Sequence, residues 1–163
     1  MFLWFAGGAA VIAWQVFRSP ALDYRVVMLG SVVPLLDALF GGVRPLHTLL
    51  AAVVALLLVM VTTRRRRLVR RRWLGVPIGM FLHLVLDGVW TDTGLFWWPL
   101  FGDGGNGARG RLPEVDRGAL SFVLELAGII ALVWFWRRTG LADDAVARRR
   151  FVRTGQLPRT HVV

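Results

Sequence analysis

Five ionisable side chains stand inside otherwise apolar stretches of this chain. They are Asp37, His47, His83, Asp87 and Glu125. An ionised side chain at the centre of a membrane helix costs about 2.5–3.5 kcal/mol, so each group needs a partner, a proton or a bound cation. Two imidazoles with two or three carboxylates form a nitrogen and oxygen ligand set that suits zinc, and also manganese or iron(II). The residue types therefore predict a divalent-metal site, with zinc as the first choice of metal.

The spacing of these residues predicts that they share one site. His83 and Asp87 are four positions apart, so on a helix they lie on one face, one turn apart. The same face passes back through Gly79 and Gly75, whose small size lets a neighbouring helix approach closely. The other polar residues share stripes with small ones: Asp37 with Gly30, Pro34 and Gly41, His47 with Ala51 and Ala55, and Glu125 with Ser121 and Gly128. We therefore expect all five to face inward and to meet at one depth.

Structural explanations compete with the metal site. A single intramembrane histidine is more often a hydrogen-bond partner between helices than a ligand, and an Asp–His pair can satisfy itself. Arg44 lies between Asp37 and His47, where it could neutralise a carboxylate, hold a phosphate or lie at a membrane interface. Because intramembrane ionisable groups usually serve function, the set of five favours a functional site. The same residues could also form a proton or cation pathway or tie a structural bundle together.

Five apolar stretches must position these residues. They cover residues 1–17, 25–43, 46–61, 73–90 and 119–136. Hydrophobic residues make up 56 % of the 163 residues and charged residues 18 %, which excludes a disordered polar chain. Each stretch is close to the length that crosses a bilayer as a helix. The sequence predicts an all-α, polytopic transmembrane helical bundle of about five helices, of which the second could be re-entrant because Pro34, Gly41 and Gly42 interrupt it.

Arginine supplies all 20 basic residues and gives the chain a net charge of +10. Most of these arginines lie in segments 64–72 and 137–159. This excess of positive charge predicts that both segments are cytoplasmic, which places loop 92–118 outside and the polar site in the outer half of the bundle. Residues 1–136 then form a transmembrane domain and residues 137–163 a basic cytoplasmic tail. The arginine runs suit anionic lipids better than nucleic acid, for which a basic run alone is a weak motif.

The order of the motifs resembles a known family. The chain carries Pro34-x-x-Asp37, Arg44-x-x-His47-Thr48-Leu49, His83-Leu-x-Leu-Asp87 and Phe96-Trp-Trp-Pro99. Over residues 25–102 this order resembles the bacterial inner-membrane metal-dependent hydrolases, also described as LexA-regulated membrane proteins. The resemblance implies a mononuclear centre of Asp37, His47, His83 and Asp87, since Leu35 and Ala38 stand where the family has an acid and a histidine. It also implies a place in the bacterial cytoplasmic membrane.

Together these observations predict an integral membrane protein with a divalent-metal hydrolase site. A bound cation would lower the pKa of a water molecule toward neutrality, and Glu125 or Asp87 would act as general base. The depth of the site favours a lipid or lipid-linked phosphoester as substrate, held by Arg44. The predicted partners are the lipid bilayer and this lipid-like substrate. The alternative is a non-enzymatic membrane protein that uses the same cluster as a proton or cation pathway or as a structural link.

Overall fold

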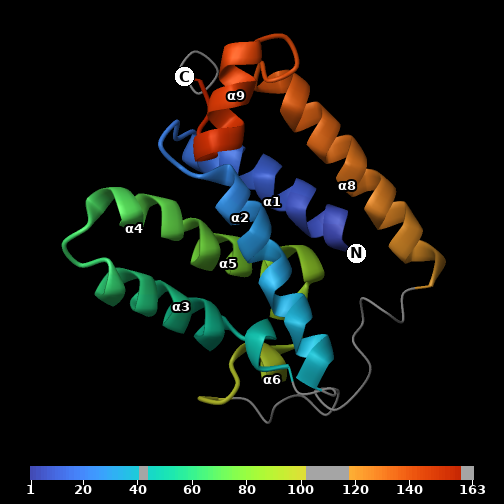
Figure 1. Cartoon of the computed structure of the whole chain (residues 1–163). Coiled ribbons are helices and arrows are strands. Elements are labelled where there is room, and N and C mark those ends of the chain that lie inside the picture. The colour runs from blue at the N-terminus through green and yellow to red at the C-terminus, as the bar shows by residue number, and fades with distance from the viewer. Residues whose placement is uncertain (41–43, 102–117, 159–163) are drawn as a thin grey trace.

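The computed structural model describes residues 1–40, 44–101 and 118–158, and every regular element in these ranges is a helix (Figure 1). The α-helices are α1 (Phe2–Phe17), α2 (Tyr24–Val32), α3 (Leu49–Thr62), α4 (Arg67–Trp73), α5 (Gly75–Asp87), α6 (Thr93–Phe96), α8 (Ala119–Arg138) and α9 (Ala145–Thr154). Short 3-10 helices are η1 (Val33–Phe40), η2 (Pro45–His47) and η3 (Val89–Thr91). The predicted all-α fold is confirmed for these residues.

Among the described residues, α8 is the one helix that is both long and apolar enough to cross a bilayer. It spans 20 residues, which at about 1.5 Å per residue matches the thickness of a hydrocarbon core. Only 11 % of its most apolar window is buried, unlike the core helix of a soluble protein. Helices α1 and α3 are apolar but shorter. The predicted bundle of five membrane-spanning helices thus stays a prediction.

The second apolar stretch is not one α-helix over residues 25–43. The α-helix ends at Val32 and the chain continues as the 3-10 helix η1. Pro34 accounts for the change, because it has no backbone N–H to donate to the preceding turn. The predicted interruption at Pro34 is confirmed, whereas Gly41 and Gly42 lie outside the described residues.

The third and fourth stretches also begin and end differently from the prediction. Thr48 caps α3 by accepting a hydrogen bond from the backbone N–H of Ala51 (3.2 Å), so His47 precedes the helix and does not share its stripe. The fourth stretch is interrupted after Trp73, where α4 ends, and α5 begins at Gly75; residues 67–72 of the predicted arginine loop are helical. Gly88, at φ +77°, ends α5 in the left-handed conformation that glycine tolerates, so Trp90 lies beyond the helix.

Glycines set how closely the central helices approach. Helix α2 packs on α5 along the face that carries Gly75 and Gly79, as the spacing predicts. A Cβ atom added at Gly79 would lie 2.5 Å from the backbone nitrogen of Ser31, and one at Gly30 would lie 2.5 Å from the carbonyl oxygen of Val76. On the other side α1 packs on α8, where a Cβ at Gly7 would lie 2.5 Å from the carbonyl oxygen of Gly128.

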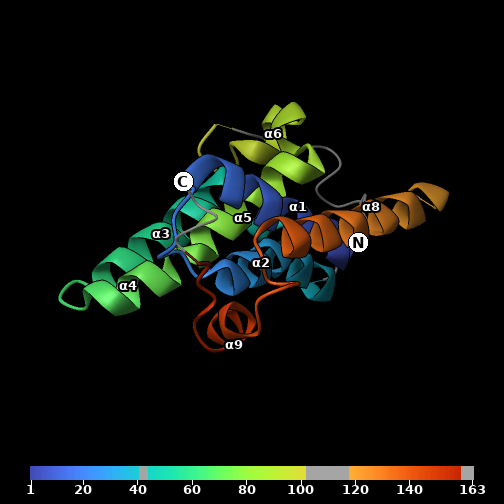
Figure 2. The ribbon, with the colours of Figure 1, turned by 90° about the horizontal axis from the view of Figure 1, so that it is seen from above.

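The main hydrophobic core joins both ends of the chain. It contains alanines of α1, Tyr24 and Val27 of α2, and Leu141, Phe151 and Leu157 from residues 137–163, which the sequence predicts to be a basic cytoplasmic tail. Figures 1 and 2 show α9 beside the start of α2 and α6 at the opposite end of the molecule. Residues 141–157 are therefore packed against the helices that precede them.

We expect Gly79→Ala to lower the thermal stability of the purified protein. The added methyl group would meet backbone atoms of α2, and these can shift only if the whole helix shifts. Overpacking of this kind lowers the free energy of unfolding by about 1–3 kcal/mol. The helix propensity of alanine returns at most about 1 kcal/mol of this. Gly8→Ala is the matched control, since the atoms nearest to its methyl group would belong to the flexible side chain of Leu86 and not to backbone. Equal melting temperatures for the two variants would contradict the close α2–α5 packing.

Candidate metal centre

His47 is oriented by a buried carboxylate. Its Nδ1 lies 2.8 Å from Oδ2 of Asp37, and both side chains are fully buried. The same oxygen accepts the backbone N–H of Leu46 at 2.9 Å. Pro45 begins the short helix η2, where its missing N–H costs nothing, and this turn brings His47 back over η1. A carboxylate in its ionised form only accepts hydrogen bonds, so the contact selects the tautomer of His47 with the proton on Nδ1 when Asp37 is in that form.

His83 is oriented by a backbone carbonyl of α2. Its Nδ1 lies 2.6 Å from the carbonyl oxygen of Ser31, and its ring stacks on Phe5 with the centroids 3.9 Å apart. Pro34 keeps this carbonyl available, because it cannot donate the i to i−3 bond that the 3-10 helix would otherwise make to Ser31. A carbonyl oxygen also only accepts, so Nδ1 of His83 is the protonated nitrogen as well.

The two imidazoles face each other through their remaining nitrogens. Nε2 of His47 and Nε2 of His83 are 3.3 Å apart, and the rings meet edge to face with centroids 5.0 Å apart. A neutral imidazole that is protonated on Nδ1 presents a bare lone pair at Nε2. Two such lone pairs repel at this distance. The arrangement therefore favours a proton or a metal cation between the two nitrogens.

Asp87 completes a group of three potential ligands. One ligand atom from each of His47, His83 and Asp87 lies within 4.8 Å of the others, and Asp87 is half-buried at the last turn of α5. The predicted juxtaposition of His83 and Asp87 on one face of a helix is confirmed by this group. Two nitrogens bound to one tetrahedral zinc at about 2.0–2.1 Å are about 3.3 Å apart, so the two imidazoles fit such an ion. The three residues could therefore hold a divalent metal ion.

Asp37 lies behind this group and is not part of it. Sequence reasoning predicts Asp37 as a metal ligand, whereas its Oδ2 lies against Nδ1 of His47. Carboxylates in this position orient histidine ligands and raise their basicity. Oδ1 of Asp37 is buried and has no hydrogen-bond partner within the described part of the chain.

Two further predicted site residues lie on other elements. Arg44 is buried (7 % exposed) immediately before η2, and its carbonyl oxygen accepts the backbone N–H of His47 at 3.1 Å. Glu125, on α8, accepts the backbone N–H groups of Phe2 and Leu3 at 2.8 Å each and that of Trp4 at 3.4 Å. These N–H groups are at the start of α1 and have no acceptor within the helix, so Glu125 stabilises that helix end. The catalytic roles predicted for Arg44 and Glu125 stay predictions.

Ser31 and Phe5 contribute to the site without having been predicted. Neither residue type signals metal chemistry, and Ser31 contributes a backbone atom that any residue carries. Pro34 is the residue from which the role of Ser31 could be predicted. A proline within a helical stretch has no backbone N–H, so a carbonyl oxygen of the preceding turn keeps no donor within the helix.

Comparison with known proteins adds no assignment: no protein-family description, no curated protein and no solved structure matches this chain. The resemblance to inner-membrane metal-dependent hydrolases therefore stays a prediction that rests on the motifs themselves.

We expect Asp37→Asn to weaken zinc binding by about 10–100-fold without abolishing it, because loss of an outer-shell carboxylate has effects of this size. Competition with a chelating dye on the purified full-length protein measures the affinity. Asp144→Asn is the control, since Asp144 caps α9 through the N–H groups of Val146 and Ala147 and contributes nothing to the metal group. An unchanged affinity in Asp37→Asn, or an equal loss in both variants, would contradict the orienting role of Asp37.

Proposed function

We propose that this protein is a membrane-embedded hydrolase that depends on a divalent metal held by His47, His83 and Asp87. One observation carries the proposal: the Nε2 atoms of the two buried histidines lie 3.3 Å apart, each on a ring whose Nδ1 faces an oxygen. Three protein ligands are the number that catalytic zinc sites use, with the fourth position left to water or substrate. A structural zinc site would instead be closed by four protein ligands.

The exposed apolar surface supports a membrane location. Phe122 on α8 is 81 % exposed and Val61 on α3 is 69 % exposed, and both belong to helices with further exposed leucine and valine side chains. Soluble monomers rarely expose contiguous apolar surface on this scale, whereas lipid would cover it. We place the protein in the bacterial cytoplasmic membrane as a multi-pass bundle, with the arginines of α4 and α9 on the cytoplasmic side.

A lipid-like substrate fits the surroundings of the metal group. A cavity of about 440 Å³ between α1, α3 and α5 is lined by apolar side chains, including Leu49 and Leu82. Leu49 follows His47 by two positions, and Leu82 is the neighbour of His83. An acyl chain in this cavity would bring a lipid headgroup to the end of α5 where the three ligands gather.

Each residue of the site has a distinct role in the proposed hydrolysis. A divalent cation, when bound, supplies Lewis acidity and lowers the pKa of a water molecule. Asp37 and the carbonyl of Ser31 hold the two imidazoles in the tautomer that presents Nε2. Of the two carboxylates expected as general base, Asp87 contributes the third metal ligand and both oxygens of Glu125 accept backbone hydrogen bonds from α1, so we assign the role of base to neither. Arg44 would bind the phosphoester group of the substrate.

A proton or cation pathway is the second candidate. Asp37, His47, His83 and the carbonyl of Ser31 form a continuous line of polar contacts of 2.8, 3.3 and 2.6 Å. Such a line could pass a proton between the imidazoles without any metal.

We expect the purified protein to bind about one zinc ion per chain and to hydrolyse lipid phosphoesters, and we expect Asp87→Ala to lose both properties. Elemental analysis and phosphate release from mixed lipid micelles measure them. Asp92→Ala is the matched control, because Asp92 lies five residues further on and its side chain caps α6 through the N–H of Leu95 (3.2 Å).

Liposome flux separates the two candidate functions. The hydrolase proposal predicts metal-dependent phosphate release and no flux. Proton or cation flux through the wild-type protein in metal-free liposomes, without phosphate release, would overturn it in favour of the pathway. A protein that takes up no divalent metal and shows neither activity would leave the bundle with a structural role alone.

A further inference from the structure

A second polar site lies where the start of α2 meets α4 and the end of α9. A cavity of about 230 Å³ opens here, and we call it the Asp23 pocket. Its charged lining residues are Asp23, Arg25, Arg71, Arg72 and Arg153. Four guanidinium groups thus surround one carboxylate, which gives the pocket a net positive charge. None of these residues belongs to the candidate metal centre.

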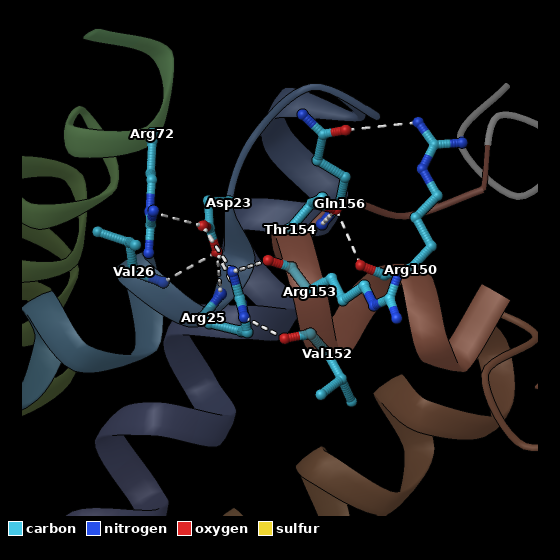
Figure 3. A network of polar contacts seen from close by, with 9 residues as sticks. All are labelled: Asp23, Arg25, Val26, Arg72, Arg150, Val152, Arg153, Thr154 and Gln156. Atoms are coloured by element: carbon cyan, nitrogen blue, oxygen red, sulfur yellow. Dashed lines mark hydrogen bonds and ion pairs between the residues drawn. The ribbon is translucent and has the colours of Figure 1, made fainter. Parts of the chain in front are cut away.

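The one carboxylate in the pocket is fully engaged by the protein. Asp23 is 2 % exposed and caps α2 by accepting the backbone N–H groups of Arg25 (3.2 Å) and Val26 (3.4 Å). Nε and one Nη of Arg25 also donate to it, at 3.2 and 3.1 Å, and Nε of Arg72 lies 3.4 Å from its Oδ2 (Figure 3). The carboxylate is therefore neutralised and hidden, so an incoming anion would meet mainly the arginines.

Arg25 links the pocket to α9. It donates from Nη1 to the carbonyl oxygen of Val152 and from Nη2 to that of Arg153, the latter at 3.3 Å (Figure 3). The backbone N–H of Tyr24 donates to the carbonyl oxygen of Gly155 at 3.0 Å. Gly155 has φ +69°, and a Cβ there would collide with the carboxylate of Asp23. The start of α2 and the end of α9 are therefore fixed to each other by short contacts.

The other three arginines of the pocket have guanidinium N–H groups that could bind a ligand. Arg71 and Arg153 are exposed, and their guanidinium groups make no hydrogen bond or ion pair with any residue that the structure describes. Arg72 meets Asp23 through Nε, so the contact orients its guanidinium while its Nη groups make no such bond within the described ranges. Planar guanidinium forks match the oxygens of a phosphate group and bind it through paired hydrogen bonds.

We propose that the Asp23 pocket binds a phosphate group through Arg71, Arg72 and Arg153, with Asp23 as a positioning residue for Arg72. The phosphate belongs either to the headgroup of an anionic lipid or to a free phosphate ion. This proposal is independent of the hydrolase proposal, because the two sites share no residue. Basic pockets between helices at the cytoplasmic side of a membrane are suited to anionic headgroups.

The test compares two double variants of the full-length protein in detergent. Arg71→Gln/Arg153→Gln removes two arginines of the pocket, and Arg65→Gln/Arg149→Gln removes two exposed arginines that do not line it. Both variants lose the same charge from the α3–α4 region and from α9. The probes are short-chain phosphatidylglycerol, short-chain phosphatidylcholine and inorganic phosphate, and calorimetry measures each affinity.

We expect the pocket variant to bind phosphatidylglycerol about tenfold more weakly or worse, while the control stays within about twofold of wild type. Phosphatidylglycerol bound more tightly than inorganic phosphate identifies a lipid headgroup as the ligand, and equal affinities identify free phosphate. Equal losses in the two variants, or phosphatidylcholine bound as tightly as phosphatidylglycerol, would overturn the proposal. Tighter binding of a single-stranded oligonucleotide that depends on Arg71 and Arg153 would also overturn it, in favour of a nucleic-acid site.

Discussion

The hydrogen bond from Nδ1 of each buried histidine to an oxygen behind it is the constraint on which the site depends. Asp37 accepts from His47, and the carbonyl of Ser31 accepts from His83. Both rings are thereby turned so that Nε2 faces Nε2 across 3.3 Å. Without these two acceptors, either imidazole could rotate or change its tautomer, and the shared position between them would be lost.

Backbone geometry creates these two acceptors. The 3-10 helix that follows Pro34 frees the carbonyl of Ser31 and carries Asp37, and the turn at Pro45 brings His47 onto Asp37. The glycine contacts between α2 and α5 then bring His83 close enough to reach Ser31. Two prolines and a glycine face, none of which bears a reactive group, therefore determine where the reactive groups lie.

The sequence predicts the parts of this arrangement that lie within one helix. The spacing of His83 and Asp87 and the glycine face of α5 follow from helical periodicity alone. Contacts between elements do not, because periodicity gives a face but not the partner that covers it. Periodicity therefore places Asp37 and Glu125 on the small-residue faces of their stretches, but it does not show that Asp37 contacts His47 or that Glu125 accepts hydrogen bonds from the start of α1. The apolar stretch 46–61 includes His47, and hydrophobicity alone does not show that the helix begins only after Thr48.

Helix α2 carries a polar site at each end. Asp23 caps its start beside the arginines, and Ser31 lies eight residues further on, about 12 Å along the helix, beside His83. The length of α2 thus separates the arginines of the Asp23 pocket from the candidate metal ligand His83.

In X-ray absorption at the zinc edge, we expect the zinc-loaded, full-length protein to show a first shell at about 2.0–2.1 Å with two imidazole nitrogens, one carboxylate oxygen and one further oxygen, and outer-shell scattering from two imidazole rings. A first shell of oxygens alone, without imidazole scattering, would show that His47 and His83 do not bind the zinc ion and would contradict the proposed centre.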